Sequence, residues 1–177
     1  MDIAEKLKSG MIGILPTDTI YGIVGIALDK SVVNRIYEVK QRTPTKPFII
    51  LISSIKDLEL FNIRLDESTL LKLYEYWPGP ISIILDCTDD KFEYLHRGTK
   101  TLAFRLPAKT ELQNIIKLSG PLVAPSANPE GETPAIDIAT AKQYFKNQVD
   151  FYIEGETNSK PSKIIKITDN FVEIIRP

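Results

Sequence analysis

The chain alternates short apolar runs with segments whose apolar residues recur at helical spacing. The valines and the isoleucine between positions 32 and 39 predict a helix over about 32–41, with Ser31 as its cap. The same kind of pattern predicts helices over four further ranges: 2–9, 66–76, 108–118 and 137–147.

The apolar runs between these helices predict strands. The run FIILIS at 48–53 has almost no polar interruption, which indicates a strand covered on both faces. PLVAPSAN at 121–128 predicts a strand that runs into a loop, and a charged loop is expected between 86 and 101. The other expected strands are 11–15, 23–28, 81–86, 101–107 and the short segments DFYIEG, SKIIKI and FVEIIRP near the end.

This order of elements is not a regular alternation of strand and helix, because paired strands occur near both ends. We therefore expect the α/β (α+β) class, with a mixed β-sheet whose margins are antiparallel and whose faces carry helices. No internal repeat, low-complexity segment or linker divides the chain, so the 177 residues are expected to form a single domain, 1–177.

Composition narrows the class of protein. Apolar residues make up 43% and charged residues 25%, as in ordinary soluble globular proteins, and no apolar run approaches the roughly 18 residues of a membrane span. The charged start, MDIAEKLKSG, does not resemble a secretory signal. The single cysteine, Cys87, fits a reducing cytoplasm, and one cysteine with one histidine argues against a zinc site.

Several common catalytic signatures are missing from the sequence. It contains no G-x-x-x-x-G-K-[ST] phosphate loop, no G-x-G-x-x-G after a strand and no G-x-S-x-G elbow. The only histidine, His96, falls in the expected charged loop without an obvious partner for a catalytic triad. The net charge of −1 gives no sign of a nucleic-acid-binding protein.

Four polar segments stand at the ends of predicted strands or helices, where α/β folds tend to build their sites. They are PTDTIYG at 16–22, the basic stretch 40–47, the strand 101–105 and PSAN at 125–128. Each has a structural reading, as a turn, a solvated helix end or a salt bridge. Arg105 interrupts an apolar strand, so its guanidinium needs an anion, which either a structural carboxylate or a ligand would supply. Together, these cationic and hydroxyl side chains predict a pocket for a polyanion.

Five motifs within and between these segments occur in a familiar order. They are PTDTIYG, the K-x-R of Lys40 and Arg42 followed by Lys46 and Pro47, WPGPIS, FRLP and APSAN. In this order the chain resembles the YrdC-like threonylcarbamoyl-AMP synthase family over nearly its whole length, in the short, single-domain form. The resemblance implies a twisted mixed β-sheet with flanking helices around a deep, positively lined concave cavity.

The resemblance also implies a reaction. L-threonine, bicarbonate and ATP, accompanied by magnesium, would give threonylcarbamoyl-AMP and pyrophosphate in the cytoplasm. Proteins of a threonylcarbamoyl-transfer complex would then modify the adenosine beside the anticodon of tRNA, and tRNA itself is a further candidate partner. No covalent nucleophile is implied: a carbamate formed from the amine of threonine would attack the α-phosphate, so the protein would act by positioning.

The family motifs assign roles residue by residue. The threonine site would consist of Thr19, Arg105, Ala124 and Ser162. The ATP site would consist of Lys40, Arg42, Lys46, Thr101, Ser126, Asn128, Thr133 and Arg176, with Lys40, Arg42, Ser126 and Asn128 as the catalytic group. No metal-ligating residue is assigned.

The chain departs from the family pattern at three places, one of them an assigned residue. Lys46 stands where members often have asparagine or histidine, and Leu51 stands where some have a histidine that contacts threonine. Lys163 follows Ser162 in a lysine-rich segment where the family tends toward Ser-Thr. These departures concern recognition of the amino acid more than binding of ATP.

Two other functions remain open from the sequence. The cluster of Lys40, Arg42 and Lys46 would also suit a module that binds structured RNA or ribosomal precursors, although few aromatic residues and no RNA-binding signature accompany it. A carbamoyl-transfer domain related to larger maturation enzymes is the third hypothesis, and it would accept carbamoyl phosphate in place of bicarbonate.

Overall fold

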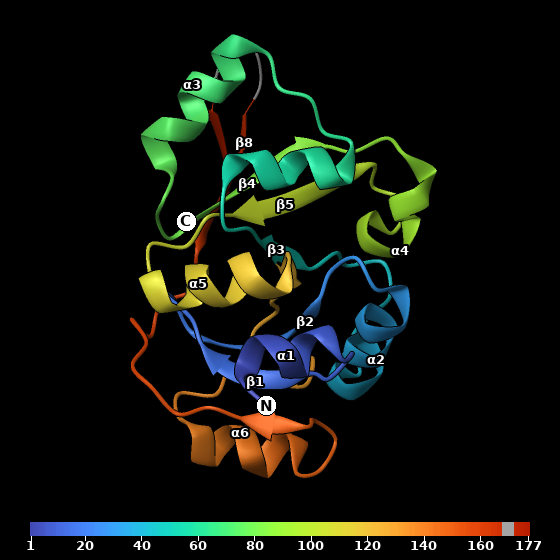
Figure 1. Cartoon of the computed structure of the whole chain (residues 1–177), viewed down its shortest axis with the longest axis vertical. Helices are drawn as coiled ribbons and strands as arrows, with labels where there is room; N and C mark the ends of the chain where they lie inside the picture. Colours follow the sequence, from blue (N-terminus) through green and yellow to red (C-terminus); the bar gives the residue numbers. More distant parts are fainter. Residues whose placement is uncertain (168–171) are drawn as a thin grey trace.

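The computed structural model describes residues 1–167 and 172–177, which form a nine-stranded mixed sheet with helices on its faces (Figure 1). The strand order is β7-β1-β2-β6-β3-β5-β4-β8-β9. The strands are β1 Gly13–Pro16, β2 Tyr21–Ile26, β3 Ile49–Leu51, β4 Ile81–Asp86, β5 Thr101–Arg105, β6 Leu122–Val123, β7 Phe151–Tyr152, β8 Lys163–Ile167 and β9 Val172–Arg176. The mixed α/β class expected from the sequence is confirmed, whereas the single-domain expectation stays a prediction.

The helices that accompany the sheet are α1 Ile3–Lys8, α2 Lys30–Lys40, α3 Glu67–Tyr76, α4 Glu93–His96, α5 Thr110–Ser119 and α6 Ile138–Phe145, with 3₁₀ helices at Ile55–Phe61 and Asp90–Phe92. None of the helices within the described ranges is long and apolar enough to cross a bilayer. The prediction of a charged loop between 86 and 101 is wrong, because this segment contains a 3₁₀ helix and α4. His96 ends α4 and is fully buried.

The sheet separates two apolar cores because successive residues of a strand point to opposite faces. On one face, α1 and α5 pack side by side against a smaller core that includes Leu15, Val24 and Leu51 (Figure 1). On the other face, Ile14, Ile23 and Ile50 enter the larger core, which includes α2. The strand within 48–53 is therefore covered on both faces, as its unbroken apolar run predicts.

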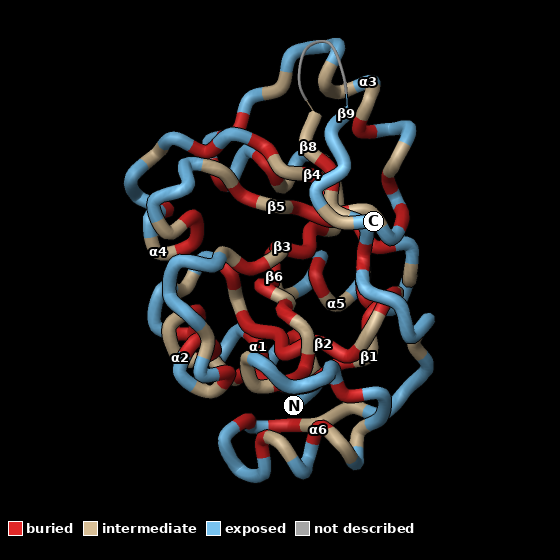
Figure 2. The backbone as a smooth tube through the Cα atoms, turned by 180° about the vertical axis from the view of Figure 1, so that it is seen from behind, coloured by how far each residue is buried: buried red, intermediate tan, exposed pale blue. Residues whose placement is uncertain are grey.

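The paired strands expected near both ends are present. β1 and β2 form an antiparallel hairpin, and β8 and β9 form another. Figure 2 shows the central strands mainly in red, for buried, and β9 in pale blue, for exposed. Of the expected strand FVEIIRP, Phe171 lies outside the described residues.

The helix α2 begins earlier than its apolar spacing suggests. Asp29, not Ser31, is its cap: the Asp29 carboxylate accepts hydrogen bonds from the backbone N–H groups of Ser31 and Val32. A carboxylate satisfies two free N–H groups here, and the Ser31 hydroxyl instead donates to it at 2.6 Å. The helix ends at Lys40, and Gln41 turns the chain with a φ of 50°.

Long-range pairing in the middle of the sheet gathers the polar segments. The short strand β6 runs antiparallel to both β2 and β3, so that it lies between them. Beyond β6, the chain continues along β2, with Ser126 bridged to Gly22. β3 runs parallel to β5 and aligns Leu51 with Arg105. The segments 16–22, 105 and 124–126 therefore meet in space although more than a hundred positions separate the first from the last.

The close packing of α2 against Gly25 of β2 supplies a stability test. A Cβ atom at Gly25 would lie 2.5 Å from Cγ1 of Val32 and 3.1 Å from atoms of Ile12 and Ile36. We expect Gly25→Ala to lower the free energy of unfolding by about 1–3 kcal/mol, because the packed helix α2 must shift. Urea unfolding followed by circular dichroism measures this change.

The matched control removes the methyl group that causes the clash. Since Val32 is the nearest contact, Gly25→Ala combined with Val32→Ala should cost less than the sum of the two single changes. Fully additive losses would contradict the proposed contact.

Candidate active site

A concave cavity of about 290 Å³ lies where the polar segments meet. Seven of the residues assigned by the family motifs line it: Thr19, Arg42, Arg105, Ala124, Ser126, Ser162 and Arg176. Its volume is at the small end of the range of roughly 300–1,000 Å³ that is usual for ligand pockets. Its three arginines face no carboxylate among the lining residues, so the cavity is cationic. The deep cavity implied by the resemblance stays a prediction.

The turn at 16–22 is held by its own hydroxyl groups. Thr17 Oγ1 donates to the carbonyl of Ile20 at 2.7 Å, accepts from the N–H of Thr19 at 3.1 Å and lies 3.0 Å from the Thr19 hydroxyl. The Tyr21 hydroxyl donates to the carbonyl of Gly155 at 2.6 Å. The polar residues therefore both satisfy the turn and form a wall of the cavity.

Arg105 is almost completely buried and needs a negative partner. Its Nη2 lies 3.0 Å from Oδ1 of Asp18 and 3.4 Å from the Thr17 hydroxyl, and the Asp18 side chain is only 7% exposed. Burial lowers the pKa of Arg105, Asp18 opposes that shift, and the nearby Arg176 adds to it. The sequence left open whether a structural carboxylate or a ligand pairs with Arg105. Asp18, which belongs to the polar turn, is such a carboxylate.

Arg42 reaches the cavity from the loop that follows α2. Its Nε donates to the carbonyl of Lys46 at 3.2 Å, its Nη2 lies 3.5 Å from the carbonyl of Pro47, and its guanidinium lies 5.4 Å from the centre of the Phe48 ring. Backbone carbonyls and a ring orient this guanidinium, which forms no ion pair with the described residues. Its charge remains available to an anion in the cavity.

Arg176, at the end of β9, closes another side of the cavity. Its Nε and Nη2 donate to the carbonyl of Ser162 at 3.0 and 2.6 Å, and Nη2 also lies 3.1 Å from the Ser162 hydroxyl. Ser162 in turn shares a 2.9 Å hydrogen bond with Ser82 on β4. Burial lowers the pKa of Arg176. These bonds fix the terminal strand against the site.

Lys40 does not line the cavity, although its motif assigned it to ATP. The residue is 1% exposed, and its ammonium group donates to the carbonyls of Ser126 and Asn128, both at 2.5 Å. Burial, and then the charge of Arg42, lower the pKa of Lys40 to about 7, against the opposing charge of Glu130. Lys40 therefore holds the loop at 126–128 from behind, while Ser126 lines the cavity in front.

Two other assigned residues lie away from the cavity wall. The Lys46 ammonium forms an ion pair with Glu130. Thr101 is at the opposite end of β5 from Arg105, about 13 Å along the strand, and its hydroxyl lies 3.3 Å from that of Thr99. Neither residue is among those that line the cavity.

The loop after Ser126 holds the last two assigned residues, which also do not line the cavity. The Asn128 amide donates to the carbonyls of Pro129 and Glu132 at 2.9 and 2.7 Å, while its buried Oδ1 has no partner. Thr133 is exposed and lies 3.5 Å from the Tyr144 hydroxyl. Leu51 is also absent from the cavity, because it is buried in the smaller core.

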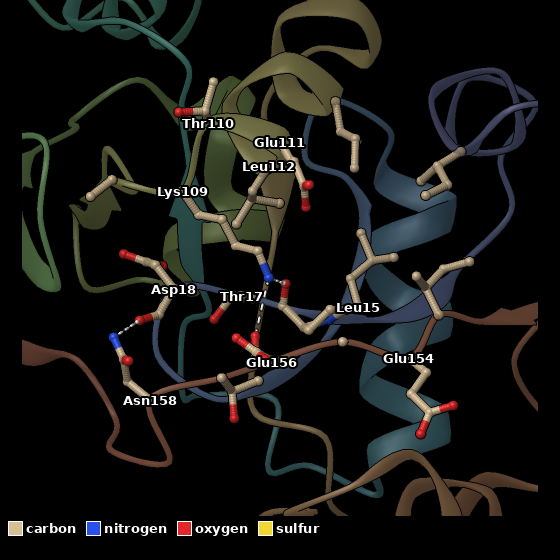
Figure 3. A pocket seen from close by; sticks show the side chains of 17 residues that line it. Leu15, Thr17, Asp18, Lys109, Thr110, Glu111, Leu112, Glu154, Glu156 and Asn158 are labelled. Carbon is tan, nitrogen blue, oxygen red and sulfur yellow. Dashed lines mark hydrogen bonds between the residues drawn. The ribbon is translucent and has the colours of Figure 1, made fainter.

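A larger cavity of about 1080 Å³ lies beside the start of α5 (Figure 3). Lys109 crosses it and donates to the carbonyls of Pro16 and Glu156 at 3.5 and 3.1 Å. Four of its lining residues are acidic, namely Asp18, Glu111, Glu154 and Glu156, and Lys109 is the one cation among them. This acidic lining would repel a polyanion, so the smaller cavity is the better candidate despite its volume.

Sequence reasoning missed two residues that organise the site, Asp18 as a partner of Arg105 and Glu130 as a partner of Lys46. Asp18 stands inside a polar segment that the sequence does single out. Glu130 is one acidic residue in a loop and follows no pattern.

Fold and site define an α/β protein with an arginine-lined, cationic pocket at the centre of a mixed sheet. The model of the Sua5/YciO/YrdC family, described as "Telomere recombination", matches residues 5–177. The chain belongs to this family, which confirms the resemblance read from its motifs.

Known relatives extend this result. A protein of Pyrococcus abyssi named threonylcarbamoyl-AMP synthase is 31% identical over 98% of the chain, and a Coxiella burnetii protein of the same name is 27% identical over 87%. The crystal structure of P. abyssi Sua5 complexed with L-threonine matches 98% of the chain with a TM-score of 0.89 and 31% identity. The chain spans about half of the P. abyssi protein, 52%, and 83% of the C. burnetii protein.

The buried lysine yields a pH prediction. The pKa of Lys40 is about 7 in the folded protein, below the 10.5 of a free side chain, so the folded state binds fewer protons between these values. Stability due to this residue should therefore rise with pH. Between pH 7 and 9 the free energy of unfolding should rise by about 2 kcal/mol relative to Lys40→Met.

Denaturant unfolding at each pH measures this difference. Lys8→Met, which changes an exposed lysine, is the control and should follow the wild-type curve. Parallel curves for Lys40→Met and the wild type would contradict the prediction.

Proposed function

We propose that this chain is an L-threonylcarbamoyladenylate synthase. It joins L-threonine, bicarbonate and ATP into threonylcarbamoyl-AMP and releases pyrophosphate. The observation that carries the proposal is the convergence of Arg42, Arg105 and Ser126 in one cationic cavity, in a chain whose relatives bear this name. The threonine held by P. abyssi Sua5 supports the amino-acid part.

The residues of the cavity suit different parts of the substrates. Arg105, held by Asp18, pairs with the carboxylate of threonine, next to Thr19, Ala124 and Ser162. Arg42, Ser126 and Arg176 bind the phosphates of ATP. Lys40 acts from behind by shaping the 126–128 loop, to which Asn128 belongs. Lys46, Thr101 and Thr133 contact ATP only if it extends beyond the 290 Å³ of the cavity.

The proposed mechanism is positional. Bicarbonate gives carbon dioxide and hydroxide, and the amine of threonine adds to the carbon dioxide to form a carbamate, losing a proton that converts the hydroxide to water. An oxygen of the carbamate then attacks the α-phosphate while the bond to pyrophosphate breaks. Arg42 and Ser126 stabilise the negative charge that gathers on the phosphate oxygens. The cavity holds the two reactants together and lowers the entropic cost of their encounter.

Magnesium would enter with ATP. The described residues contain no group of three or more histidine, cysteine, aspartate or glutamate side chains that could hold an ion. Magnesium often binds substrate phosphates and keeps several waters, which fits such a site. When bound, it would neutralise phosphate charge alongside the arginines.

The product would pass to partner proteins that transfer the threonylcarbamoyl group to tRNA, in the cytoplasm, with residues 1–177 acting as one domain. Direct RNA binding by the basic cluster is less well supported, because Lys40 is buried and Lys46 is paired with Glu130. A steep salt dependence of tRNA binding that ATP does not reduce would favour the RNA-binding function instead.

Pyrophosphate release tests the proposed reaction. The protein with ATP, bicarbonate and threonine should release pyrophosphate, and release should stop without threonine. Arg42→Ala and Ser126→Ala should each lower the rate by about 10²–10³, because each removes stabilisation of developing charge. Circular dichroism should show both variants folded.

The control for the choice of cavity is Lys109→Met, which removes the cation of the larger cavity. This variant should keep nearly the wild-type rate. Near-normal rates for Arg42→Ala or Ser126→Ala would show that the site is misplaced. Efficient use of carbamoyl phosphate in place of bicarbonate would instead indicate a carbamoyl-transfer domain.

A further inference from the structure

The loops at 41–47 and 125–134 are joined by one carboxylate, that of Glu130. Glu130 accepts hydrogen bonds from the N–H of Thr43 at 2.5 Å and from its hydroxyl at 2.8 Å, and it forms an ion pair with Lys46. The N–H of Glu130 donates to the carbonyl of Lys40 at 2.8 Å. Glu130 thus contacts two positions of the first loop, Thr43 and Lys46, and also Lys40 at the end of α2.

These three positions flank Arg42. Its Nε donates to the carbonyl of Lys46, which also accepts from the Tyr37 hydroxyl at 2.9 Å. The N–H of Lys46 donates to the carbonyl of Thr43 at 3.2 Å, which closes the loop into a turn. The orientation of the Arg42 guanidinium therefore depends on a turn that Glu130 anchors at both ends.

The charge of Glu130 suits this task. The hydrogen bond from Lys46, followed by those from Thr43, lowers the pKa of Glu130 to about 2. The carboxylate is therefore ionised at neutral pH and remains a strong acceptor. It also occupies the ammonium of Lys46, which leaves Arg42 as the cation that this loop presents to the cavity.

We propose that Glu130 is a positioning residue that anchors the 41–47 loop through Thr43 and Lys46, so that Arg42 is held ready for the phosphates of the nucleotide. Glu130 itself does not line the cavity. The identification of the anion as a nucleotide rests on the proposed function, whereas the coupling between Glu130 and Arg42 does not.

Binding of inorganic triphosphate, measured by isothermal titration calorimetry, tests the coupling without turnover. Glu130→Ala should weaken binding about tenfold, a size common for residues that share one network. In the Arg42→Ala background the same change should have no further effect, because Glu130 acts through Arg42. An equal loss in both backgrounds would overturn the proposal.

Glu130→Gln keeps an acceptor for Thr43 but frees the Lys46 ammonium, and it provides a second test if Glu130→Ala does not fold. We expect weaker triphosphate binding than in the wild type. Tighter binding would mean that the freed charge of Lys46 outweighs the position of Arg42, and it would overturn the proposal. Glu130→Gln combined with Lys46→Gln should also bind more weakly than the wild type.

The matched control is Arg35→Gln, which breaks the ion pair between Arg35 of α2 and Asp150. It should leave triphosphate affinity unchanged.

In turnover assays, Glu130→Ala should raise the KM for ATP about tenfold and change the KM for threonine little. If Glu130→Ala weakens triphosphate binding only when Arg42 is present, but the wild-type protein releases no pyrophosphate, the proposed function alone is refuted. If the wild-type protein is active but the effect of Glu130→Ala does not depend on Arg42, the role of Glu130 alone is refuted.

Discussion

The buried guanidinium of Arg105 is the constraint on which the site depends. A charged group in the middle of an apolar sheet is stable only when it is paired and hydrogen-bonded. Asp18 provides the pairing and Thr17 the hydrogen bond, and both come from the turn between β1 and β2. This requirement ties the first hairpin to β5 at the centre of the sheet. It also explains why the turn is rich in hydroxyl and carboxylate groups where a simpler turn would join two strands.

The cations of the basic motif then divide into two kinds. The guanidinium of Arg42 lies at the cavity, whereas the ammonium of Lys40 donates hydrogen bonds to the carbonyls of Ser126 and Asn128 behind the cavity wall. A buried ammonium with two carbonyl partners fixes a loop more firmly than a solvated ammonium would. If either hydrogen bond broke, a buried polar group would have no partner. Arg42 at the cavity wall and Lys40 behind it therefore come from neighbouring positions of the same short segment.

Local patterns in the sequence predicted most elements but not their neighbours. Apolar spacing identifies the helix ending at Lys40 and the first hairpin, because both depend on residues close in the chain. The insertion of β6 between β2 and β3 is a long-range pairing that no local pattern encodes. Seven of the residues that the family motifs assigned line one cavity, yet the motifs did not show that Arg42 lines it and Lys40 does not. Burial decides that difference, and a lysine at a helix end is ordinarily solvated. Glu130 was missed because a single acid in a loop has no periodicity.

The distribution of charge explains why the smaller cavity would select anions. Burial lowers the pKa of Arg105 and of Lys40, and the charges of Arg176 and Arg42 respectively add to these shifts, so the cations at and behind the cavity wall repel one another. Asp18 pairs with Arg105 and Glu130 pairs with Lys46, but neither carboxylate lines the cavity or neutralises Arg42. A polyanion that enters relieves the repulsion in addition to forming its own bonds. Because binding and protonation are linked, such an anion should also raise the pKa of Lys40. Lys40, behind the wall, would then carry a full positive charge when the substrate is present.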